Sequence, residues 1–324
     1  MSARATAIAH ANIALAKYWG KRAIAGNVPA TPSVSLTLSG LQTRTTVVFD
    51  RAFEVDALEL DGQLTRGRPL DRVSKLLDEV RALGKLDLRA KVTSENGFPT
   101  ASGLASSASG FAALARAATA AANVELDDSS LSRLARRASA SAARSIFGGF
   151  VALGTEDDAA AVPIAPASHW SIAMVVAAVT VARKEIGSTE AMERTRLTSP
   201  YFSAWIDDSK KLARDVVEAI TGRDLERLGV AAEASALRMH ACAMAASPPV
   251  LYWSPSTLEL LSAVRALRAS GVGAWATIDG GPHVKVICHA DDAPLVVERV
   301  KPFCVRTIVA RPGDGARVIE EGAS

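Results

Sequence analysis

The sequence predicts an α+β fold in which strands dominate the first half and helices precede a small sheet in the second. Residues 34–38 alternate apolar and polar side chains, and residues 45–49 form a β-branched run, so both segments are typical of strands. Residues 203–220 and 224–245 repeat apolar side chains at helical spacing over a far greater length. Because strands and helices do not alternate regularly, we expect two layers in each half rather than a doubly wound sheet.

The other elements of the first half follow the same two periodicities. Strands are expected at residues 88–93 and 150–153, and helices at residues 70–83, 103–122 and 128–147. Gly84 ends the apolar face of the first of these helices, and the second is rich in alanine, the strongest helix former. Asp127 is a suitable N-cap for the third helix, and Gly148–Gly149 ends it.

The second half closes with short strands. They are expected at residues 172–182, 274–279, 284–288 and 305–309, with a helix at residues 292–300. The first of these segments is apolar almost throughout, which indicates a strand buried on both faces. At about eleven residues it is too short to cross a membrane, which takes about 20, so no membrane partner is expected.

The length of the chain indicates more than one hydrophobic core. A chain of 324 residues is long for a single core, so we expect two domains, residues 1–185 and residues 186–324. The net charge is only +3 and the arginines are scattered, so nucleic acid is not expected as a partner. Cys242, Cys288 and Cys304 lack metal-ligand or CxxC spacing, and the N-terminus lacks a signal-peptide pattern, so we expect a cytoplasmic protein.

A Gly- and Ser-rich segment at residues 99–110 is the sharpest local signal. It contains two glycines and five hydroxyl residues at the start of the Ala-rich helix. A helix N-terminus exposes about four unpaired N–H groups and a partial positive charge, so this segment would cradle an anion. It lacks the GxxxxGK[ST] order of a Walker P-loop. A Ser-capped packing helix explains the composition equally well.

Two basic segments and one carboxylate complete the set of candidate chemical groups. Residues 17–22 contain three cations and two aromatics, although a basic turn with Trp19 packed on the core would look the same. Ser141 and Arg144 lie three residues apart, hence on one helix face, unless this stretch is only a solvated helix edge. Asp279 ends a strand before Gly280–Gly281–Pro282, where a lone aspartate is usually a turn former.

Together these segments offer an anion cradle, several cations and one carboxylate. Catalysis of phosphoryl transfer consists mostly of positioning and charge neutralisation, so these are the groups it needs.

The segments resemble the diphosphomevalonate decarboxylases of the GHMP superfamily, which also contains galactokinase, homoserine kinase, mevalonate kinase and phosphomevalonate kinase. The matching stretches occur in the family's order and are residues 12–22, 96–107, 136–150 and 279–282, with residues 187–192, 240–242 and 248–249 also similar. The Lys-Tyr-Trp-Gly-Lys run at residues 17–21 is particular to the decarboxylase branch.

The resemblance implies a two-domain GHMP-type fold. Its N-terminal, ATP-binding half would be like ribosomal protein S5 domain 2 and its C-terminal half ferredoxin-like, with the active site between them. The implied reaction uses ATP and Mg²⁺ to phosphorylate the C3 hydroxyl of mevalonate 5-diphosphate, after which phosphate and CO₂ leave and isopentenyl diphosphate forms. The family also implies the mevalonate pathway of isoprenoid biosynthesis and a homodimer.

The resemblance also implies roles for individual residues. Asp279 would act at the C3 hydroxyl, and Lys17 and Arg144 would face the carboxylate that is lost. The implied substrate-binding residues are Tyr18, Lys21, Ser139, Ser141, Arg144, Ser188 and Met192. The implied nucleotide-binding residues are Ser94, Asn96, Gly103, Ala105, Ser106 and Ser107. The Mg²⁺ ligands are not identified by any pair of acidic residues.

This chain departs from the family's pattern in three places. Thr31–Pro32–Ser33 stands for the usual Asn-Ser-Ser, Ala138–Ser139–Ala140–Ser141 for Gly-Ser-Gly-Ser, and Asp279–His283 for Asp-Ala-Gly-Pro-Asn. These changes leave open a mevalonate 5-phosphate decarboxylase, a small-molecule kinase that phosphorylates without decarboxylating, and a non-catalytic anion-binding protein. The five histidines form no cluster, and His240 is expected to pack or cap rather than catalyse.

Overall fold

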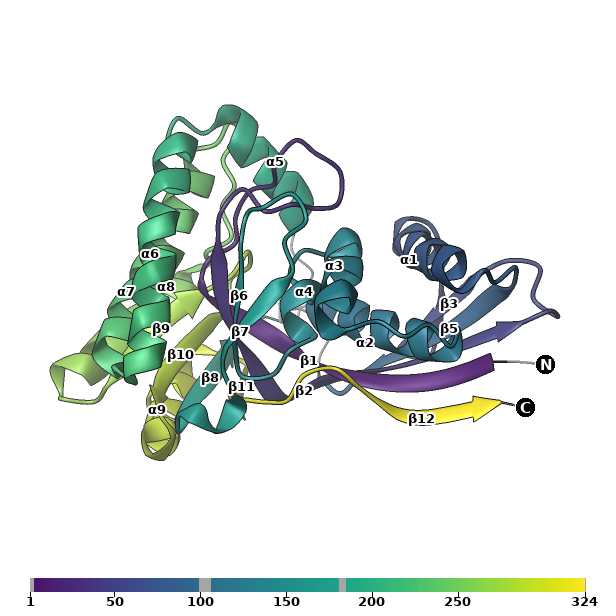
Figure 1. Ribbon diagram of the computed structural model, residues 1–324. Helices are drawn as coiled ribbons and strands as arrows, with labels where there is room; N and C mark the ends of the chain where they lie inside the picture. Colours follow the sequence, from purple (N-terminus) through teal and green to yellow (C-terminus); the bar gives the residue numbers. More distant parts are fainter. Residues whose placement is uncertain (1–2, 99–105, 181–184, 324) are drawn as a thin grey trace.

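The computed structural model describes residues 3–98, 106–180 and 185–323. It contains an eight-stranded sheet with helices on one side and a four-stranded sheet with long helices packed against it (Figure 1). The α+β fold class predicted from the periodicities is therefore confirmed.

The eight-stranded sheet is built around two long neighbouring strands. The strand order is β12-β1-β2-β5-β3-β4, and β6, which pairs with β2, adds β7. Its strands are β1 (Ala3–Ala16), β2 (Ser33–Asp50), β3 (Ala57–Leu60), β4 (Gln63–Thr65), β5 (Arg89–Asn96), β6 (Phe150–Leu153), β7 (Ala161–Ala165) and β12 (Arg317–Ala323). The two strands predicted at residues 34–38 and 45–49 are one strand, β2, because Gly40, at φ +80°, lets the chain continue through an irregularity in its pairing with β1.

Four helices cover one face of this sheet: α1 (Arg68–Gly84), α2 (Ser106–Ala121), α3 (Asp128–Ala138) and α4 (Ala142–Ser145) (Figure 1). Ala5, Ala7 and Ala9 of β1 share a buried cluster with alanines of α2 such as Ala112 and Ala115. Small side chains on both elements allow the helix to lie close to the strand. The Ala-rich segment past its first turn is therefore core.

The helix predicted over residues 128–147 is two helices in the structure. Asp127 caps α3 as expected, accepting a hydrogen bond from the Ser130 amide. At Ser139 the backbone becomes extended, with φ −155° and ψ 118°, and α4 begins after Ser141. The prediction of one continuous helix was wrong, and the break gives Ser139 and Ser141 a place in a turn instead of on a helix face.

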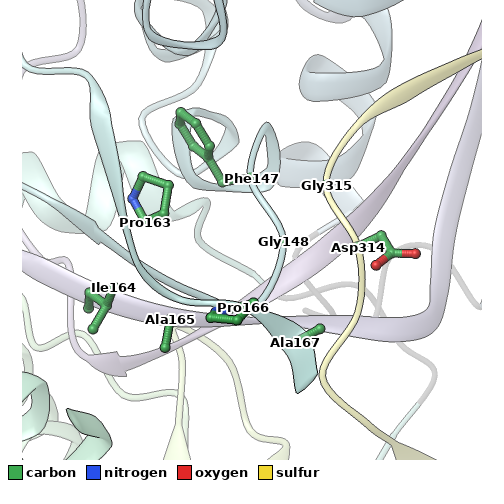
Figure 2. Close-up of a pocket in the computed structure, with 9 residues that line it drawn as sticks. All are labelled: Phe147, Gly148, Pro163, Ile164, Ala165, Pro166, Ala167, Asp314 and Gly315. Atoms are coloured by element: carbon green, nitrogen blue, oxygen red, sulfur yellow. The ribbon is translucent and has the colours of Figure 1, made fainter. Parts of the chain in front are cut away.

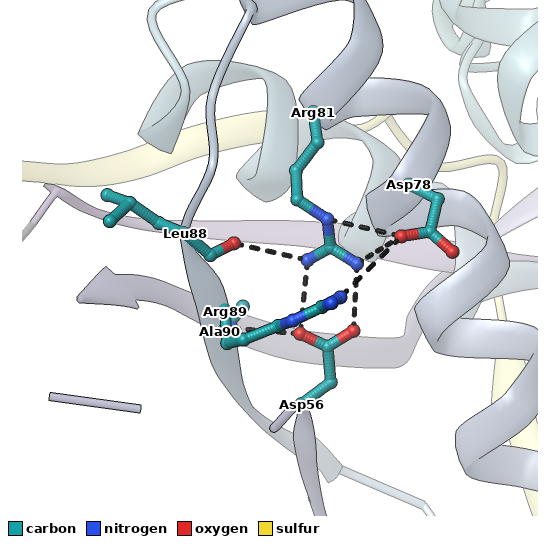
Figure 3. A network of polar contacts seen from close by, with 6 residues as sticks. All are labelled: Asp56, Asp78, Arg81, Leu88, Arg89 and Ala90. Carbon is teal, nitrogen blue, oxygen red and sulfur yellow. Dashed lines mark hydrogen bonds and ion pairs between the residues drawn. The ribbon is translucent and has the colours of Figure 1, made fainter. Parts of the chain in front are cut away.

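A buried guanidinium fastens α1 to the sheet (Figure 3). Arg81 makes two parallel hydrogen bonds to Asp56, at 3.0 and 2.9 Å, and it also bonds to Asp78 and to the Leu88 carbonyl. The Asp56 carboxylate in turn accepts the Ala90 amide of β5 at 2.9 Å. Bidentate pairing of this kind sets the geometry as well as the energy of the contact.

The four-stranded sheet is buried on both faces. Its order is β11-β8-β10-β9, and its elements are β8 (Ile172–Ala178), α5 (Ser188–Thr198), α6 (Phe202–Gly222), α7 (Leu225–Met244), α8 (Pro255–Ala269), β9 (Ala274–Ile278), β10 (Val284–His289), α9 (Ala293–Val300) and β11 (Arg306–Ala310). Ile172, Met174 and Val176 of β8 pack into one cluster, and the intervening Ala173 and Val175 pack into another. Burial on both faces explains the continuous apolar run in the sequence. The sequence analysis had missed α5, α8, β7 and β12.

The two sheets are not separated at a single point of the chain. β8, which precedes residue 185, belongs to the second sheet, whereas β12, near the C-terminus, pairs with β1 of the first (Figure 1). One buried cluster contains Ile13 of β1 as well as Met174 of β8 and Val216 of α6. The division into residues 1–185 and 186–324 stays a prediction.

Within the described residues, no helix combines the length and the hydropathy that a membrane span requires.

Candidate active site

An aspartate held between two buried lysines is the centre of the candidate site. Lys17 follows β1 directly, and its Nζ lies 2.6 Å from Oδ1 of Asp279, which follows β9. Lys285, on the neighbouring strand β10, places its Nζ 3.0 Å from Oδ2 of the same carboxylate. Both lysine side chains are 1% exposed, whereas the Asp279 side chain is 23% exposed. The carboxylate therefore joins the two sheets and keeps one side accessible.

The surroundings shift the pKa values of these groups in opposite ways. Burial by itself would raise the pKa of Asp279, but the charges of Lys17 and Lys285 outweigh it and hold that pKa well below its usual range. Burial lowers the pKa of Lys17 to about 8, although the ion pair with Asp279 opposes this shift. Asp279 is therefore an anion at neutral pH, and Lys17 is an ammonium that loses its proton unusually early.

Arg144, on α4, is a buried cation bound by neutral oxygens. It is 2% exposed. Its guanidinium donates to Ser33 Oγ at 2.6 Å, Ser35 Oγ at 2.9 Å and Asn12 Oδ1 at 3.2 Å. Burial lowers its pKa to about 10, and it also contributes to the lowered pKa of Lys17. The structure thus brings Arg144, Lys17 and Asp279 within electrostatic reach of one another, as the resemblance implied.

Two buried histidines flank Asp279. His240, on α7, donates from Nε2 to the backbone carbonyl of Asp279 at 3.1 Å, which agrees with the expected packing or capping role. His283 accepts the Val179 amide at Nδ1, at 3.2 Å. Burial lowers the pKa of His240 to about 3 and that of His283 to about 4, so both are neutral at physiological pH.

The residues expected at the phosphorylated end of the substrate gather near Lys21. Its Nζ donates to Asn27 Oδ1 at 2.6 Å, and Asn27 in turn donates to the Arg137 carbonyl. Burial, with repulsion from Arg72 and Arg68 of α1, lowers the pKa of Lys21. An excess of positive charge therefore surrounds this ammonium group, as a phosphate-binding site requires.

The serines and the tyrosine of the same group lie in the turn after α3 and in the segment after β1. Ser139 Oγ and Ser141 Oγ lie 3.3 Å apart. The Tyr18 hydroxyl is buried without a hydrogen-bond partner among the described residues, and burial raises its pKa. An unpartnered buried hydroxyl is costly unless a ligand completes it.

Ser188 and Met192 lie on α5, which packs on the Lys17–Trp19 segment. Ser188, the first residue of α5, lies close to Gly280, where a Cβ would come within 3.3 Å of its Oγ. Met192 is 4% exposed and belongs to a cluster with Trp19 and Trp205. Met192 is thus a core residue beside the candidate site, and its predicted contact with substrate stays a prediction.

The residues expected to bind nucleotide lie around the start of α2. Ser106 and Ser107 are its first two residues. The side chains of Ser94 and Asn96 bond to Thr45 and Thr43 across the sheet, at 2.9 and 2.7 Å. Gly103 and Ala105 lie outside the described residues. The nucleotide roles of all six stay predictions.

Neither a nearby cavity nor a metal cluster supplies an alternative centre. A pocket of about 450 Å³ opens where residues 314–315 cross Gly148, and Pro163, Ala165 and Pro166 form part of its lining (Figure 2). It contains none of the predicted site residues. The described part of the chain also lacks any group of three His, Cys, Asp or Glu side chains able to hold a metal.

Lys285, Asn12, Arg72 and His283 are neighbours of the site to which the sequence analysis gave no role. A lysine inside the apolar run of residues 284–288 was a detectable signal, since lysine is rarely buried without a partner. Asn12 was within a matched stretch without a stated role. Arg72 carries no local signal, because only the packing of α1 brings it near Lys21.

Comparison with known proteins accounts for this arrangement. Residues 9–162 match the family model of the diphosphomevalonate decarboxylase-like N-terminal domain, and residues 174–315 match that of the mevalonate 5-diphosphate decarboxylase C-terminal domain. The chain belongs to the diphosphomevalonate decarboxylase family. The diphosphomevalonate decarboxylase of Candida albicans is 36% identical over 89% of this chain and 84% of its own length. That of Saccharomyces cerevisiae is 33% identical over 89% and 78%.

Solved structures of the family share the whole fold. Mevalonate diphosphate decarboxylase from Staphylococcus aureus superimposes with a TM-score of 0.94 at 35% identity, covering 99% of both chains. A structure of MDDEF in complex with MVAPP, AMPPCP and magnesium superimposes with a TM-score of 0.93 at 39% identity, covering 99% of this chain and all of that one. The two-domain GHMP-type fold expected from the resemblance is thereby confirmed.

Proposed function

We propose that this protein decarboxylates mevalonate 5-diphosphate in an ATP-dependent reaction that yields isopentenyl diphosphate, ADP, phosphate and CO₂. Membership of the diphosphomevalonate decarboxylase family supports this function. The single structural observation that supports it most is the Asp279 carboxylate between two buried lysines, with the buried Arg144 within electrostatic reach.

In the first step, ATP phosphorylates the tertiary C3 hydroxyl of the substrate. A tertiary alcohol is a poor nucleophile, so orientation beside an anion matters more than a strong base. Asp279 accepts a hydrogen bond from that hydroxyl, and its depressed pKa suits an orienting anion better than a strong proton acceptor. The hydroxyls of Ser106 and Ser107 and the N-terminus of α2 bind the ATP phosphates.

In the second step, the C3–O bond to phosphate breaks and the C–C bond to the carboxylate supplies the electron pair of the new alkene. Positive charge develops at C3, and the Asp279 anion stabilises it. Lys17 and Arg144 hold the carboxylate until it leaves as CO₂, and the planar fork of the arginine suits a carboxylate. Tyr18, Lys21, Ser139 and Ser141 bind the 5-diphosphate.

Mg²⁺ accompanies ATP in this proposal. The described residues lack a cluster of acidic side chains, which fits an ion held mostly by nucleotide phosphates and water. When bound, it neutralises part of the phosphate charge.

We further propose a homodimer in the cytoplasm. The family resemblance supports the dimer, and the free thiols of the three cysteines suit a reducing compartment. Sedimentation equilibrium of the purified protein measures the mass of the assembly, and a monomer at micromolar concentration would exclude the dimer.

ATP-dependent release of CO₂ from mevalonate, its 5-phosphate and its 5-diphosphate tests the function. We expect ADP and CO₂ in equal amounts and the highest kcat/KM with the diphosphate. ADP without CO₂ would indicate a kinase, preference for the monophosphate would replace the substrate, and the absence of both products would overturn the proposal.

A further inference from the structure

We propose that Lys285 is a positioning residue for decarboxylation: it shares the Asp279 carboxylate with Lys17 and so leaves Lys17 a net positive charge to offer the substrate. This inference rests on the proposed function, because the anion that Lys17 would meet is the substrate's carboxylate.

The geometry gives each oxygen of Asp279 its own lysine. Lys17 Nζ lies 2.6 Å from Oδ1, and Lys285 Nζ lies 3.0 Å from Oδ2. One carboxylate neutralises only one of two ammonium charges. The three groups together therefore carry one excess positive charge, to which Arg144 adds another.

The position of Lys285 makes this excess charge costly. Its Cα pairs with those of Val176 on β8 and Thr277 on β9, so the lysine lies in the middle of a buried sheet. Removing a charge from water in such a place carries a large penalty unless a partner compensates it. Asp279 compensates for one lysine only, and an anionic substrate would compensate for the second.

Lys285 also acts on Lys17 electrostatically. Burial is the main reason that the pKa of Lys17 lies near 8, and repulsion from Lys285 and Arg144 adds to it, while Asp279 opposes it. His240 lies close enough for the Lys17 charge to lower its pKa. Removal of the Lys285 charge would therefore make Lys17 less acidic and more fully neutralised by Asp279.

A purely structural role for Lys285 predicts something different. If Lys285 only fills space or anchors Asp279, its replacement lowers stability or turnover but leaves the acidity of Lys17 unchanged. The alkaline limb of the pH profile separates the two roles, because kcat/KM reports the pKa values of the free enzyme.

The test compares Lys285→Met, Lys285→Gln and Lys285→Arg with wild type, measuring kcat/KM for mevalonate 5-diphosphate from pH 6 to 10 at saturating ATP. Thr277→Val is the matched control, because it changes the strand residue paired with Lys285 without changing charge. Methionine suits the apolar surroundings, since hydrophobic residues often replace buried ions without loss of stability.

We expect wild type to lose activity as pH rises through about 8, the pKa of Lys17. In Lys285→Met and Lys285→Gln this limb should move upward by at least about one pH unit, and KM for the substrate should rise about tenfold while KM for ATP stays within twofold. Lys285→Arg and Thr277→Val should retain the wild-type limb.

An unmoved limb in either neutral variant would overturn the inference while leaving the proposed function intact. If neither neutral variant folds, wild type decides: an alkaline limb at pH 10 or above would show that Lys17 is not acidic enough for the role. An inactive wild type would fail the proposed function itself, through absence of CO₂ release at every pH.

Discussion

Asp279 is the residue on which the proposed chemistry depends most directly. Its carboxylate is ionised at neutral pH because two ammonium groups lie within 3.0 Å of it. An anion of this kind stabilises a cationic centre without being consumed as a base. The low pKa that makes Asp279 a good electrostatic partner makes it a weak proton acceptor.

Asp279→Asn should lower turnover by at least about 10²-fold while KM for ATP and substrate changes only a few-fold. The amide keeps the shape of the side chain but removes the charge that the developing cation needs. Steady-state kinetics measures both effects, with the melting temperature as a check, because two buried lysines lose their counter-charge. Near-normal turnover of a folded variant would contradict the role.

Lys21 is the residue that would distinguish a diphosphate from a monophosphate. Each charge-assisted hydrogen bond to the additional phosphate contributes roughly 1.5–3 kcal/mol. We therefore expect kcat/KM to be on the order of 10- to 100-fold lower with mevalonate 5-phosphate than with the 5-diphosphate.

Lys21→Ala should remove much of this difference between the two substrates. Kinetics with both substrates measures it, and Lys210→Ala is the control, since Lys210 is a surface lysine paired with Asp207 on its own helix. An undiminished preference in Lys21→Ala would show that the discriminating charge lies elsewhere, for example on Arg72.

At the scale of elements, α2 has two functions at opposite ends. Its alanines pack against β1, whereas its first residues, Ser106 and Ser107, lie at an N-terminus with unpaired amides. Substitution at the N-terminus can therefore affect ligand binding without disturbing the core.

Ser107→Ala should act mainly through ATP, raising its KM by about tenfold, while KM for the mevalonate substrate changes little. The side chain is exposed, so stability should be unaffected. Kinetics with each substrate varied in turn makes the measurement, and Ser129→Ala in the first turn of α3 is the control. A defect confined to the mevalonate substrate would place the wrong ligand at this helix.

At the scale of the whole molecule, the two buried histidines link stability to pH. The pKa values of His240 and His283 in the folded protein, about 3 and about 4, lie below the value of about 6.5 expected when unfolded. The unfolded chain therefore binds more protons below pH 6.5, and the contribution of the neutral histidines to stability is lost progressively as pH falls.

His283→Asn should reduce this loss, so that its free energy of unfolding falls less than that of wild type between pH 6.5 and 4.5. Urea unfolding at several pH values measures the difference. His289→Asn is the control, because His289 is exposed. The same pH dependence in all three proteins would show that His283 does not remain neutral in the folded state.

The fold class could be predicted from the sequence because its cause is local. The apolar run at residues 172–182 and the helical repeats at residues 203–245 reflect which faces are buried, and the structure reproduces both as β8 and as α6 and α7. The break between α3 and α4 has no such local cause. Ser139 leaves the helix where α4 packs between β1 and β6, a consequence of tertiary packing.

The sequence by itself determined the residue types of the candidate site, since hydroxyls, cations and an aspartate in a known order identify the family. Only the tertiary structure decided which groups meet. Lys17 and Asp279 are 262 positions apart, and Lys285 joins them because β9 and β10 are antiparallel neighbours. Local patterns report burial, whereas the charge and pKa of a site depend on distances that arise only when two sheets pack against each other.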